Sequence, residues 1–368
     1  MNLRFLFILS CITLFHNSEA QPTVRDSSNT VLILPGTRSL IYRRLDSATE
    51  VQILSGNVRL RQGSTLFSCD SCVINEKANL FEAFGRVHIN DSDTAHVYAN
   101  YLRYLTDKRL AFLKGAVKLT DGHGTLTTNE LEYDVAGKIG TYKNGGKVVN
   151  KKTVLTSREG VYYADINDVY FKKAVELKNP DYYLKTDSLL YNTESQIARF
   201  IAETFIRDKN KATIHTSEGF YDLKAGHAEF TKRTVIEDGA RRIVGNQIAN
   251  DDSTGMVQVL GNGVLIDTAQ GISILANEIF ANKKTEAYLA TRKPLMIVKQ
   301  EKDSIYVTAD TLFSARLTDL FKTTDTAIAI APKSKKGTST ISSEKKDSTN
   351  RYFEAFRNVR IFTDSLQA

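Results

Sequence analysis

Two cysteines offer the most direct chemistry in this chain. Cys69 and Cys72 form a Cys-x-x-Cys pair, and in an exported protein such a pair can be a redox centre or a local disulfide. Residues three apart on an extended strand point to opposite faces, so a bridge between these two would need a bend in the chain. The other interpretation is plain packing, because a free cysteine behaves as a small buried hydrophobe. We favour packing and leave the redox state open.

Histidines and acidic residues are the next candidates, and neither set has the spacing of a reactive site. Five histidines beyond the first twenty residues lack metal-ligand spacing, and we expect them on the surface: His88, His96, His123, His215 and His227. Asp91 and Asp93 could hold a cation or act as paired carboxylates, but their turn-like surroundings predict solvated loop residues. The sequence contains no glycine-rich phosphate loop, G-x-S-x-G elbow or H-E-x-x-H helix. We therefore predict no catalytic residue, no metal site, no cofactor and no enzymatic activity.

A recurring four-residue phrase provides the frame in which these residues lie. It consists of a small residue, Asn or Asp, any residue and an apolar residue, and its clearest copies begin at Ala99, Thr128, Thr186, Ala276 and Ala309. Looser copies begin at Cys69, Ser157, Ser217 and Gly245, so successive copies are 28 to 33 residues apart. A period of this length indicates stacked units that cannot bury their apolar faces alone. Because the Asn or Asp recurs in nearly every unit, we interpret it as a structural residue at a bend.

Short alternating strands surround this phrase. Each unit opens with Gly-x-Val or a relative of it, as at Gly85 and Gly115, and continues with alternating apolar and polar residues. That period of two is typical of a strand buried on one face, and turn residues such as Asp121 and Gly122 separate the strands. Apolar residues at the helical spacing of i, i+3, i+4 and i+7 never continue for the length of a helix. The sequence therefore predicts an all-β protein of about 30-residue, three-strand repeats, stacked as a β-solenoid or as layers of an elongated β-jellyroll.

Composition divides the chain into five segments. Residues 1–20 have the features of a secretory signal peptide, with cleavage expected between Ala20 and Gln21. Residues 21–50 form a polar N-terminal segment with candidate strands at 30–34 and 40–42, and residues 51–317 hold the repeats. Residues 318–350 are rich in Lys, Ser and Thr and predict a flexible linker. Residues 351–368 restart a unit and stop before its phrase, which predicts that the chain is a fragment of a longer protein.

The charge of the chain argues against one class of partner. A formal net charge of +7 over 368 residues is mild, and no basic run is interleaved with aromatic residues as nucleic-acid grooves require. We expect no nucleic-acid partner.

An export signal, Gly-x-Val strands and a recurring Ala-Asp/Asn-x-apolar-x-Tyr phrase together resemble the OstA/LptA family of lipopolysaccharide-transport proteins. The phrase is fullest at 99–104, 128–133 and 186–191, and the resemblance spans 51–317 and restarts at 351. It implies a β-jellyroll with a half-open groove that binds the acyl chains of lipopolysaccharide. It also implies a periplasmic location, with or without outer-membrane association. Its implied partners are similar jellyroll modules, joined by edge-strand pairing, and outer-membrane assembly components. Whether the chain is a free carrier, or part of a larger protein with a membrane barrel, is open.

Eight apolar residues at inward strand positions are our candidates for the lining of such a groove. They are Val58, Leu60, Val87, Ile89, Val117, Leu119, Leu265 and Ile297. The alternative for each position is core packing without lipid. Two other functions also stay open: an exported β-solenoid enzyme acting on polysaccharide, which needs carboxylates clustered on adjacent coils, and a structural surface repeat protein with a closed interior. A non-enzymatic lipopolysaccharide carrier that contributes to outer-membrane assembly is the leading hypothesis.

Overall fold

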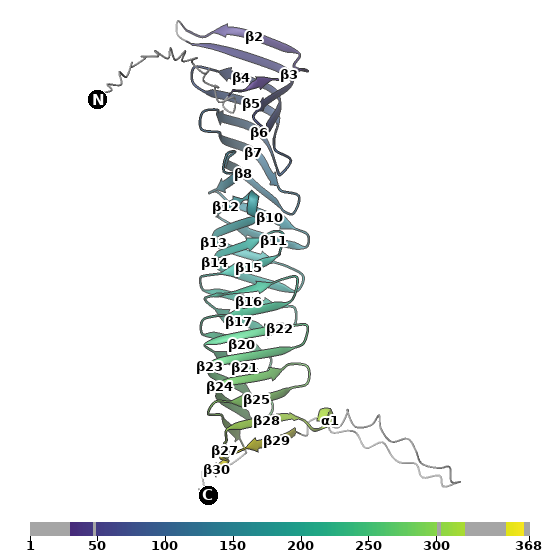
Figure 1. Cartoon of the computed structure of the whole chain (residues 1–368), viewed down its shortest axis with the longest axis vertical. Coiled ribbons are helices and arrows are strands. Elements are labelled where there is room, and N and C mark those ends of the chain that lie inside the picture. Colours follow the sequence, from purple (N-terminus) through teal and green to yellow (C-terminus); the bar gives the residue numbers. More distant parts are fainter. Residues whose placement is uncertain (1–29, 47–48, 300–302, 321–350, 364–368) are drawn as a thin grey trace, which may run out of the picture.

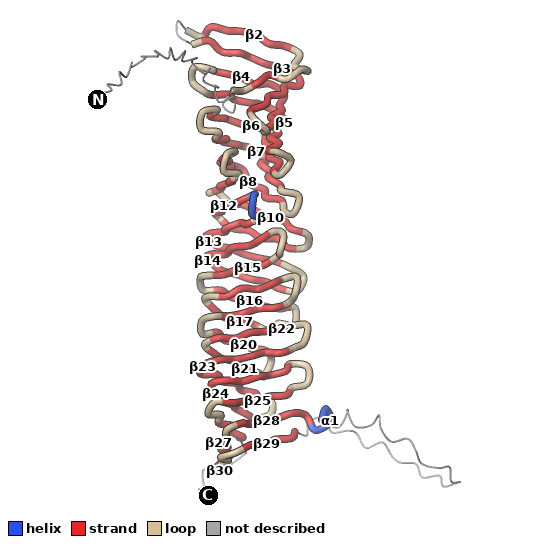
Figure 2. The backbone as a smooth tube through the Cα atoms, in the orientation of Figure 1, coloured by secondary structure: helices blue, strands red, loops and turns tan. Residues whose placement is uncertain are grey.

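The computed structural model describes residues 30–46, 49–299, 303–320 and 351–363. These residues form a long, narrow body whose strands run across its long axis (Figure 1). Its thirty strands belong to one hydrogen-bonded sheet, and in the described part only two short helical segments interrupt them (Figure 2): η2 (Ala164–Ile166) and α1 (Leu317–Leu320). The prediction of an all-β protein is therefore confirmed. The predicted signal peptide, its predicted cleavage site at Ala20 and Gln21, and most of the predicted linker lie outside the described residues.

The sheet is folded lengthwise into two walls that face each other, and ten long strands cross from one wall to the other. The long strands are β3 (Glu50–Gln62), β4 (Thr65–Asn75), β5 (Leu80–Asp91), β6 (Ala95–Leu105), β7 (Leu110–Thr120), β8 (Thr125–Asp134), β13 (Asp168–Lys178), β14 (Tyr182–Asn192), β23 (Met256–Asp267) and β24 (Ile272–Asn282). Consecutive long strands pair in antiparallel order, as β3 to β8 do.

Short strands complete the two walls. Those of the first wall are β1 (Leu32–Ile33), β10 (Gly146–Asn150), β11 (Thr153–Ser157), β16 (Thr204–Asp208), β17 (Thr213–Thr216), β20 (Thr234–Asp238), β21 (Arg241–Gly245), β26 (Leu295–Lys299), β27 (Ser304–Thr308) and β30 (Arg360–Thr363). Those of the second wall are β2 (Ser39–Arg44), β9 (Ile139–Tyr142), β12 (Glu159–Tyr163), β15 (Ile197–Phe200), β18 (Gly219–Asp222), β19 (His227–Phe230), β22 (Gln247–Asp251), β25 (Ala287–Thr291), β28 (Thr311–Arg316) and β29 (Arg351–Phe356).

The corner between the walls is made by pairs of residues with left-handed backbone. In β5 these are Gly85 and Arg86, with φ of 70° and 43°, and in β3 they are Gly56 and Asn57, with φ of 76° and 54°. The pairing register shifts at the same points, as it does between Phe84 and Val87. A bulge of this kind bends a strand, and glycine accepts its left-handed backbone without steric cost. The recurrent Gly-x-Val therefore marks the corner, not the start of a new strand.

The four-residue phrase lies on the strand next to each bulge, and the corner explains its pattern. In β6 both Ala99 and Leu102 are buried, whereas Asn100 is exposed. Residues three apart would face opposite sides of a straight strand, but the bend turns both of them toward the interior. The Asn or Asp lies outside, over the neighbouring glycine: a Cβ on Gly115 would lie 3.1 Å from Asn100 Nδ2. The predicted position of this residue at a bend is confirmed.

Two sequence expectations about the repeat are corrected by the structure. The sequence predicts three strands per unit, whereas the structure has two long strands, or four short ones where the long strands are split. The long strands continue through the corner because their pairing with the neighbouring strands resumes after it. The copy assigned to Ser217 begins one residue earlier, since Thr216 is the buried small residue there. Its hydroxyl accepts a hydrogen bond of 2.8 Å from Thr234.

The middle of the body departs from this plan. Between β14 and β23 each wall consists of four short strands, and both walls join the same long strand at either end. The order β14-β15-β18-β19-β22-β23-β21-β20-β17-β16 therefore returns to β14 as a closed ring of pairings. Strands β29 and β30 extend the two walls at the C-terminal end. The predicted fragment boundary stays a prediction.

The cysteine pair lies at the first corner. Cys69 and Cys72 are the first and fourth residues of their phrase, both face the interior, and neither forms a disulfide. A hydrogen bond to Cys69 and burial together raise the pKa of the Cys72 thiol above its ordinary value. The same hydrogen bond lowers the pKa of the Cys69 thiol, so protonation alone does not decide between the two interpretations. The burial of both side chains in the apolar core agrees with packing.

The corner generates a stability prediction. In Gly85→Ala the new methyl group would overlap the Asp70 carboxylate, which also accepts a hydrogen bond of 2.8 Å from Arg86 Nε. We expect a loss of about 1–2 kcal/mol from the left-handed backbone alone, and a further loss from the displaced carboxylate. Gly63→Ala is the matched control, because Gly63 has a φ of 56° and nothing within 4 Å of its Cβ position. Urea unfolding followed by circular dichroism measures both; equal midpoint shifts would contradict this account of the corner.

Candidate functional site

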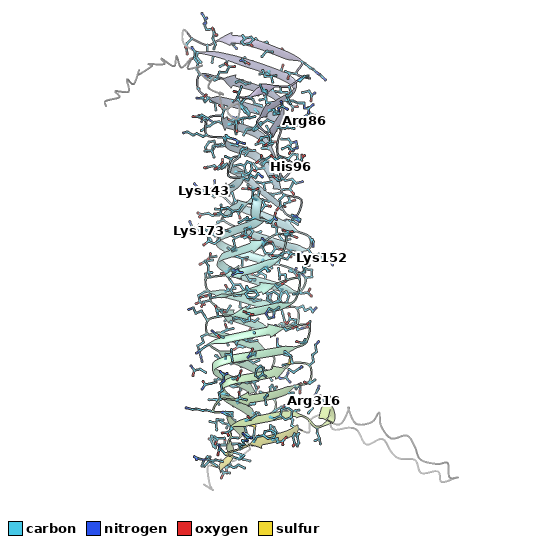
Figure 3. The ribbon with its side chains drawn as sticks, viewed as in Figure 1. Arg86, His96, Lys143, Lys152, Lys173 and Arg316 are labelled. Carbon is cyan, nitrogen blue, oxygen red and sulfur yellow. The ribbon has the colours of Figure 1, made fainter. Side chains whose placement is uncertain are left out.

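The apolar interior between the walls is the largest feature that could hold a ligand. Seven of the eight candidate groove residues lie in it and are at most 2% exposed: Val58, Leu60, Val87, Ile89, Val117, Leu119 and Leu265. They belong to one continuous cluster of buried side chains that runs from Leu54 to Leu312. Charged side chains such as Lys143, Lys152 and Lys173 project from the outside of the body (Figure 3). Lipid contact at the seven positions stays a prediction.

The eighth candidate, Ile297, was assigned to the wrong face. Its side chain is half-buried, while its neighbour Met296 is 6% exposed and belongs to the core cluster. Sequence alternation in Leu295–Lys299 is ambiguous, because four consecutive apolar residues give no polar partner to fix the face.

Opposite the corner, the tips of the two walls meet along a line that we call the seam. Side chains alone cross it in the described part; the strand ladders stay within a wall or turn the corner. Tyr104 Oη in the second wall donates a hydrogen bond of 2.5 Å to Gln62 Oε1 in the first. One unit further on, Tyr133 Oη donates to Asp91 Oδ2 at 3.1 Å, and the next unit repeats the contact between Tyr162 and Asp121. These contacts close the interior, so the predicted half-open groove is not what the structure shows.

The tyrosines of the seam recur with the period of the repeat. Tyr104, Tyr133, Tyr162, Tyr191 and Tyr221 each lie five residues after the buried small residue of their phrase, and all are at most 3% exposed. We call these five residues the tyrosine ladder. In the unit of Tyr221 the crossing contact comes from Tyr182 of the first wall to Asp252, which also accepts a hydrogen bond of 2.5 Å from Tyr221.

Burial controls the ionisation of the ladder. It raises the pKa of Tyr104 to about 12, and it raises that of Tyr191 to about 12 as well. Burial and the adjacent Asp91 together raise the pKa of Tyr133 further above the ordinary tyrosine range. The ladder is therefore protonated at neutral pH. The hydroxyls of Tyr104, Tyr133, Tyr162 and Tyr221 donate hydrogen bonds, whereas that of Tyr191 has no partner among the described residues.

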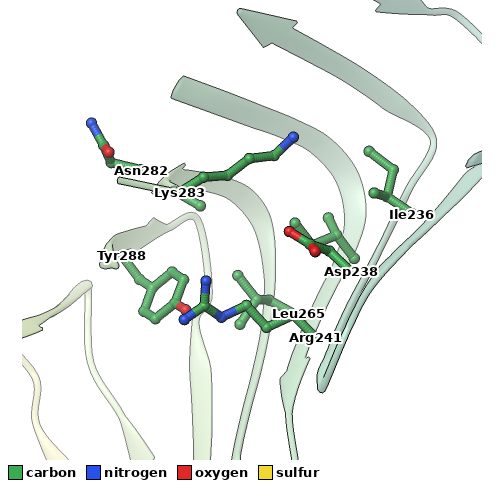
Figure 4. A pocket seen from close by; sticks show the side chains of 9 residues that line it. Ile236, Asp238, Arg241, Leu265, Asn282, Lys283 and Tyr288 are labelled. Atoms are coloured by element: carbon green, nitrogen blue, oxygen red, sulfur yellow. The ribbon is translucent and has the colours of Figure 1, made fainter. Parts of the chain in front are cut away.

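The ladder is broken in the two units that follow Tyr221. The equivalent positions, five residues after Gly245 and Ala276, are Asn250 and Ala281. At Ala281 a small pocket lies between the tips of the two walls (Figure 4), and its cavity of about 20 Å³ has room for about one water molecule. It is lined by the apolar residues Ile236, Ile243, Leu265 and Ala281 and by Asp238, Arg241, Asn282, Lys283 and Tyr288.

Charges beside this pocket are mostly paired with one another. Arg241 Nε donates a hydrogen bond of 3.1 Å to Asp267, and its Nη2 donates one of 2.5 Å to Glu286 across the seam. Glu286 also approaches Arg351 at 3.7 Å. Lys283 forms no ion pair among the described residues, and the buried hydroxyl of Tyr288 has no hydrogen-bond partner there. Asp238 in the same lining also forms no ion pair in the described part, so the lining holds a cation, a carboxylate and a hydroxyl.

The remaining sequence candidates do not form a reactive site. His88 and His96, predicted on the surface, are half-buried and in contact, with 3.1 Å between His88 Nε2 and His96 Nδ1. Asp93 is exposed as predicted, but Asp91 is not solvated: it is 2% exposed and its carboxylate accepts hydrogen bonds from Thr65 and Tyr133. In the described ranges no three His, Cys, Asp or Glu side chains are grouped closely enough to hold a metal ion. No helix of this part is long and apolar enough to span a membrane.

Sequence reasoning missed the seam, although the signal for it was present. The recurring phrase of the family includes the tyrosine. The polar partner of each tyrosine, however, lies 41 or 42 residues upstream, as Asp91 does from Tyr133 and Asp121 from Tyr162. That separation of about one and a half repeats puts the partner on the other wall. Only a folded-sheet model of the repeat would have suggested the pairing.

Comparison with known proteins finds one family model that matches part of the chain. Residues 30–187 match the model of the OstA-like protein family. Among solved structures, one similar chain is LptH from Pseudomonas aeruginosa, described as the LptA-homologous periplasmic component of the conserved lipopolysaccharide transport device. The likeness has 19% identity and a TM-score of 0.27, and it covers 30% of this chain and 82% of LptH. No curated protein matches the sequence. The resemblance to the OstA/LptA family, first drawn from the repeat, is confirmed.

The protonated ladder predicts sensitivity to alkali. Between pH 10 and about 12 the unfolded chain releases a tyrosine proton that folded Tyr104 retains, so stability falls as pH rises, by about 1.4 kcal/mol per pH unit for each such group. Tyr104→Phe should flatten this slope and cost about 1–3 kcal/mol at neutral pH, because the buried Gln62 Oε1 loses the Tyr104 hydroxyl as a donor. Tyr42→Phe, at an exposed side chain, should change neither. Urea unfolding at several pH values measures both effects, and an unchanged slope in Tyr104→Phe would refute the role of burial.

Proposed function

We propose, from the premise that residues 30–187 of this chain are OstA-like, that the protein binds lipopolysaccharide in the periplasm and contributes to outer-membrane assembly. It does so without catalysing a reaction. The apolar interior accommodates acyl chains, and the polar outer face remains in water. The observation that carries this proposal is the continuous apolar cluster enclosed by two walls along the whole described body.

The interior is packed in the closed state, so lipid binding requires the walls to separate at the seam. The corner side of the sheet is held by backbone ladders across every bulge, whereas the seam is held by side-chain contacts alone. A neutral hydrogen bond such as that of Tyr104 to Gln62 contributes about 0.5–1.5 kcal/mol, and one to a carboxylate, such as that of Tyr133 to Asp91, contributes about 1.5–3 kcal/mol. Burial of acyl methylene groups, at about 0.8 kcal/mol each, can offset several of these contacts. Opening at the seam, with the corner as the hinge, is therefore the motion that the fold favours.

The two ends of the body favour association with similar modules. At the N-terminal end of the described part, β1 and β2 pair only with β3, and β2 exposes Leu40, Ile41 and Tyr42. At the other end β29 and β30 expose Phe353, Phe356 and Ile361. An unpaired strand edge with apolar side chains is a template for strand addition. We infer that an OstA-like module pairs with an end of this sheet and continues the apolar interior.

Photo-crosslinking tests the lipid proposal. A benzophenone amino acid at Val117 in the interior should label lipopolysaccharide, and the same probe at the adjacent, outward-facing Lys118 should not. The two positions differ by one residue on the same strand, so they share expression level and local concentration. Labelling at Lys118 but not at Val117 would show surface adsorption and would refute binding in the interior.

Edge association has its own test. Ile41→Pro removes a backbone donor and a 55% exposed side chain from β2, and we expect it to abolish association of this end with another module. The control is Tyr163→Ala, which removes an exposed aromatic side chain from the side of the body. Sedimentation velocity over a concentration series measures the assembly of both. Equal association of Ile41→Pro and the parent protein would rule out strand addition at this edge.

A further inference from the structure

We propose that the outer face of the first wall binds a free acidic polysaccharide, a chain of sugars with carboxylates or phosphates, along a row of cationic side chains. Lys118 and Lys147, on either side of a shallow hollow, make the central contacts. This site lies on the outside of the body, goes beyond the proposed function and does not require lipid in the interior.

A line of directly opposed residues crosses the outer face of the first wall from Arg59 in β3 to His215 in β17. We call it the cationic row. Each member pairs with the next on the adjacent strand, as Lys118 does with Thr127 and Thr127 with Lys147. Directly opposed residues share a face of the sheet, and both neighbours of Lys118 in β7 are buried. The row therefore lies on the outside of the body.

Positive charge dominates this row. Its one carboxylate, Glu176, forms an ion pair of 3.1 Å with Lys178. Its lysines and arginines are Arg59, Lys118, Lys147 and Lys185. With the histidines neutral, four cations and one carboxylate give the row a net charge of +3. An anionic partner is therefore favoured at this face.

A comparable row on the outside of the second wall is balanced. There Glu82 lies opposite Arg103, and Glu132 and Arg199 follow on later strands of the same line. Two carboxylates and two cations give this row no net charge. The excess of positive charge therefore belongs to the outer face of one wall and is not spread over the body.

A hollow lies within the cationic row. It has a volume of about 630 Å³, it is open to solvent, and its lining includes Lys118, Thr127, Asn129 and Lys147. Neither lysine forms an ion pair within the described ranges, and no carboxylate of the described residues lines the hollow. Ammonium groups form their strongest hydrogen bonds with ionised oxygens. Two unpaired ammonium groups beside a hydroxyl and an amide suit a ligand with both acidic and hydroxyl groups.

The twist of the sheet favours a flexible chain over a flat membrane as the partner. Neighbouring strands of a sheet are rotated by roughly 20–25° relative to one another, and the cationic row crosses twelve strands. The row therefore turns about the long axis of the body. A planar anionic bilayer can contact only part of such a row at one time, whereas a polymer can follow it.

The order of side chains favours a saccharide over a nucleic acid. From Lys118 to Lys185 the members of the row are Lys, Thr, Lys, Thr, Glu and Lys. Single-stranded nucleic acids are held by bases that stack on aromatic rings, and this stretch offers hydroxyls in their place. The hydroxyls of Thr127 and Thr156 can both donate to and accept from sugar hydroxyls.

The position of the row favours a free polymer over the sugars of the lipid cargo. A second outer row, from Arg61 to Thr213, lies between the cationic row and the tips that form the seam. A lipopolysaccharide whose acyl chains enter at the seam holds its sugars at those tips. The cationic row lies midway across the wall and, at about 4.8 Å per strand, is about 50 Å long. A long polysaccharide therefore fits it better.

Fluorescence anisotropy with labelled oligogalacturonate tests the site on the full chain. The double variant Lys118→Gln, Lys147→Gln should weaken binding at least about tenfold, which is about 1.4 kcal/mol, because both ammonium groups of the hollow are lost. The matched control is Arg103→Gln, Arg199→Gln, which removes the same charge from the comparable row and should have a much smaller effect. Lys118→Arg, Lys147→Arg should retain most of the binding. High salt should weaken the parent protein more than the double glutamine variant.

The outcomes distinguish this site from other partners and from the carrier function. Equal weakening by the two glutamine variants would overturn the site, as would no binding of oligogalacturonate by the parent protein. Preference for single-stranded DNA, for phosphatidylglycerol vesicles or for lipid-free lipopolysaccharide sugars would overturn the assignment of the partner. If the double variant fails to fold by circular dichroism, the single variants Lys118→Gln and Lys147→Gln should each show part of the loss. Oligogalacturonate contains no lipid, so its failure to bind leaves the labelling expected at Val117 unaffected.

Discussion

The whole architecture depends on a steric constraint at the corner, where two consecutive residues adopt left-handed backbone beneath a short polar side chain. Glycine satisfies this constraint in β3, β5, β7 and β23, and Lys173 with Ala174 satisfies it in β13. The corner reverses which residues face inward, so a single strand can contribute to both walls and keep its apolar residues inside on each. Without it, these five strands would each present their second half to the wrong side. The folded sheet, its enclosed interior and its seam all follow from that reversal.

The two long sides of the body are held by different kinds of interaction. On the corner side the backbone is continuous and the ladders of hydrogen bonds pass through each bulge. On the seam side the walls touch through Tyr104, Tyr133, Tyr162 and their polar partners, and there the contacts are individually weak and fully buried. The corner side is therefore fixed by backbone hydrogen bonds, and the seam side is held by side chains, with an Arg241–Glu286 ion pair crossing it in the unit where Ala281 replaces the tyrosine.

Most of the architecture could be predicted from the sequence, because periodicity of two and a fixed repeat are local signals. The all-β class, the period, the bend at Asn100 and the inward positions of Val87 and Val117 were all accessible in this way. The predicted three-strand unit was wrong because Gly-x-Val can mark either a left-handed bulge within a strand or a chain reversal between two strands. The sequence pattern alone does not distinguish these two structures. Asp91 was misplaced because a polar residue beside a turn gives no sign of a tyrosine hydroxyl 42 residues downstream. The site depends on such contacts between walls, and these are set by the fold and not by neighbours in sequence.

The antiparallel meander also determines how the chain can reach its native state. Each strand pairs with strands close to it in sequence, as β14 does with β15 and β16. Few contacts therefore depend on segments that are distant in the sequence. Chains with such low contact order fold quickly and need little long-range search, and stacked repeats can propagate structure from one unit to the next. A polypeptide that emerges gradually, N-terminus first, could therefore fold unit by unit upon the units already formed. The growing end would always present a fresh strand edge, which is then covered by the next segment to appear.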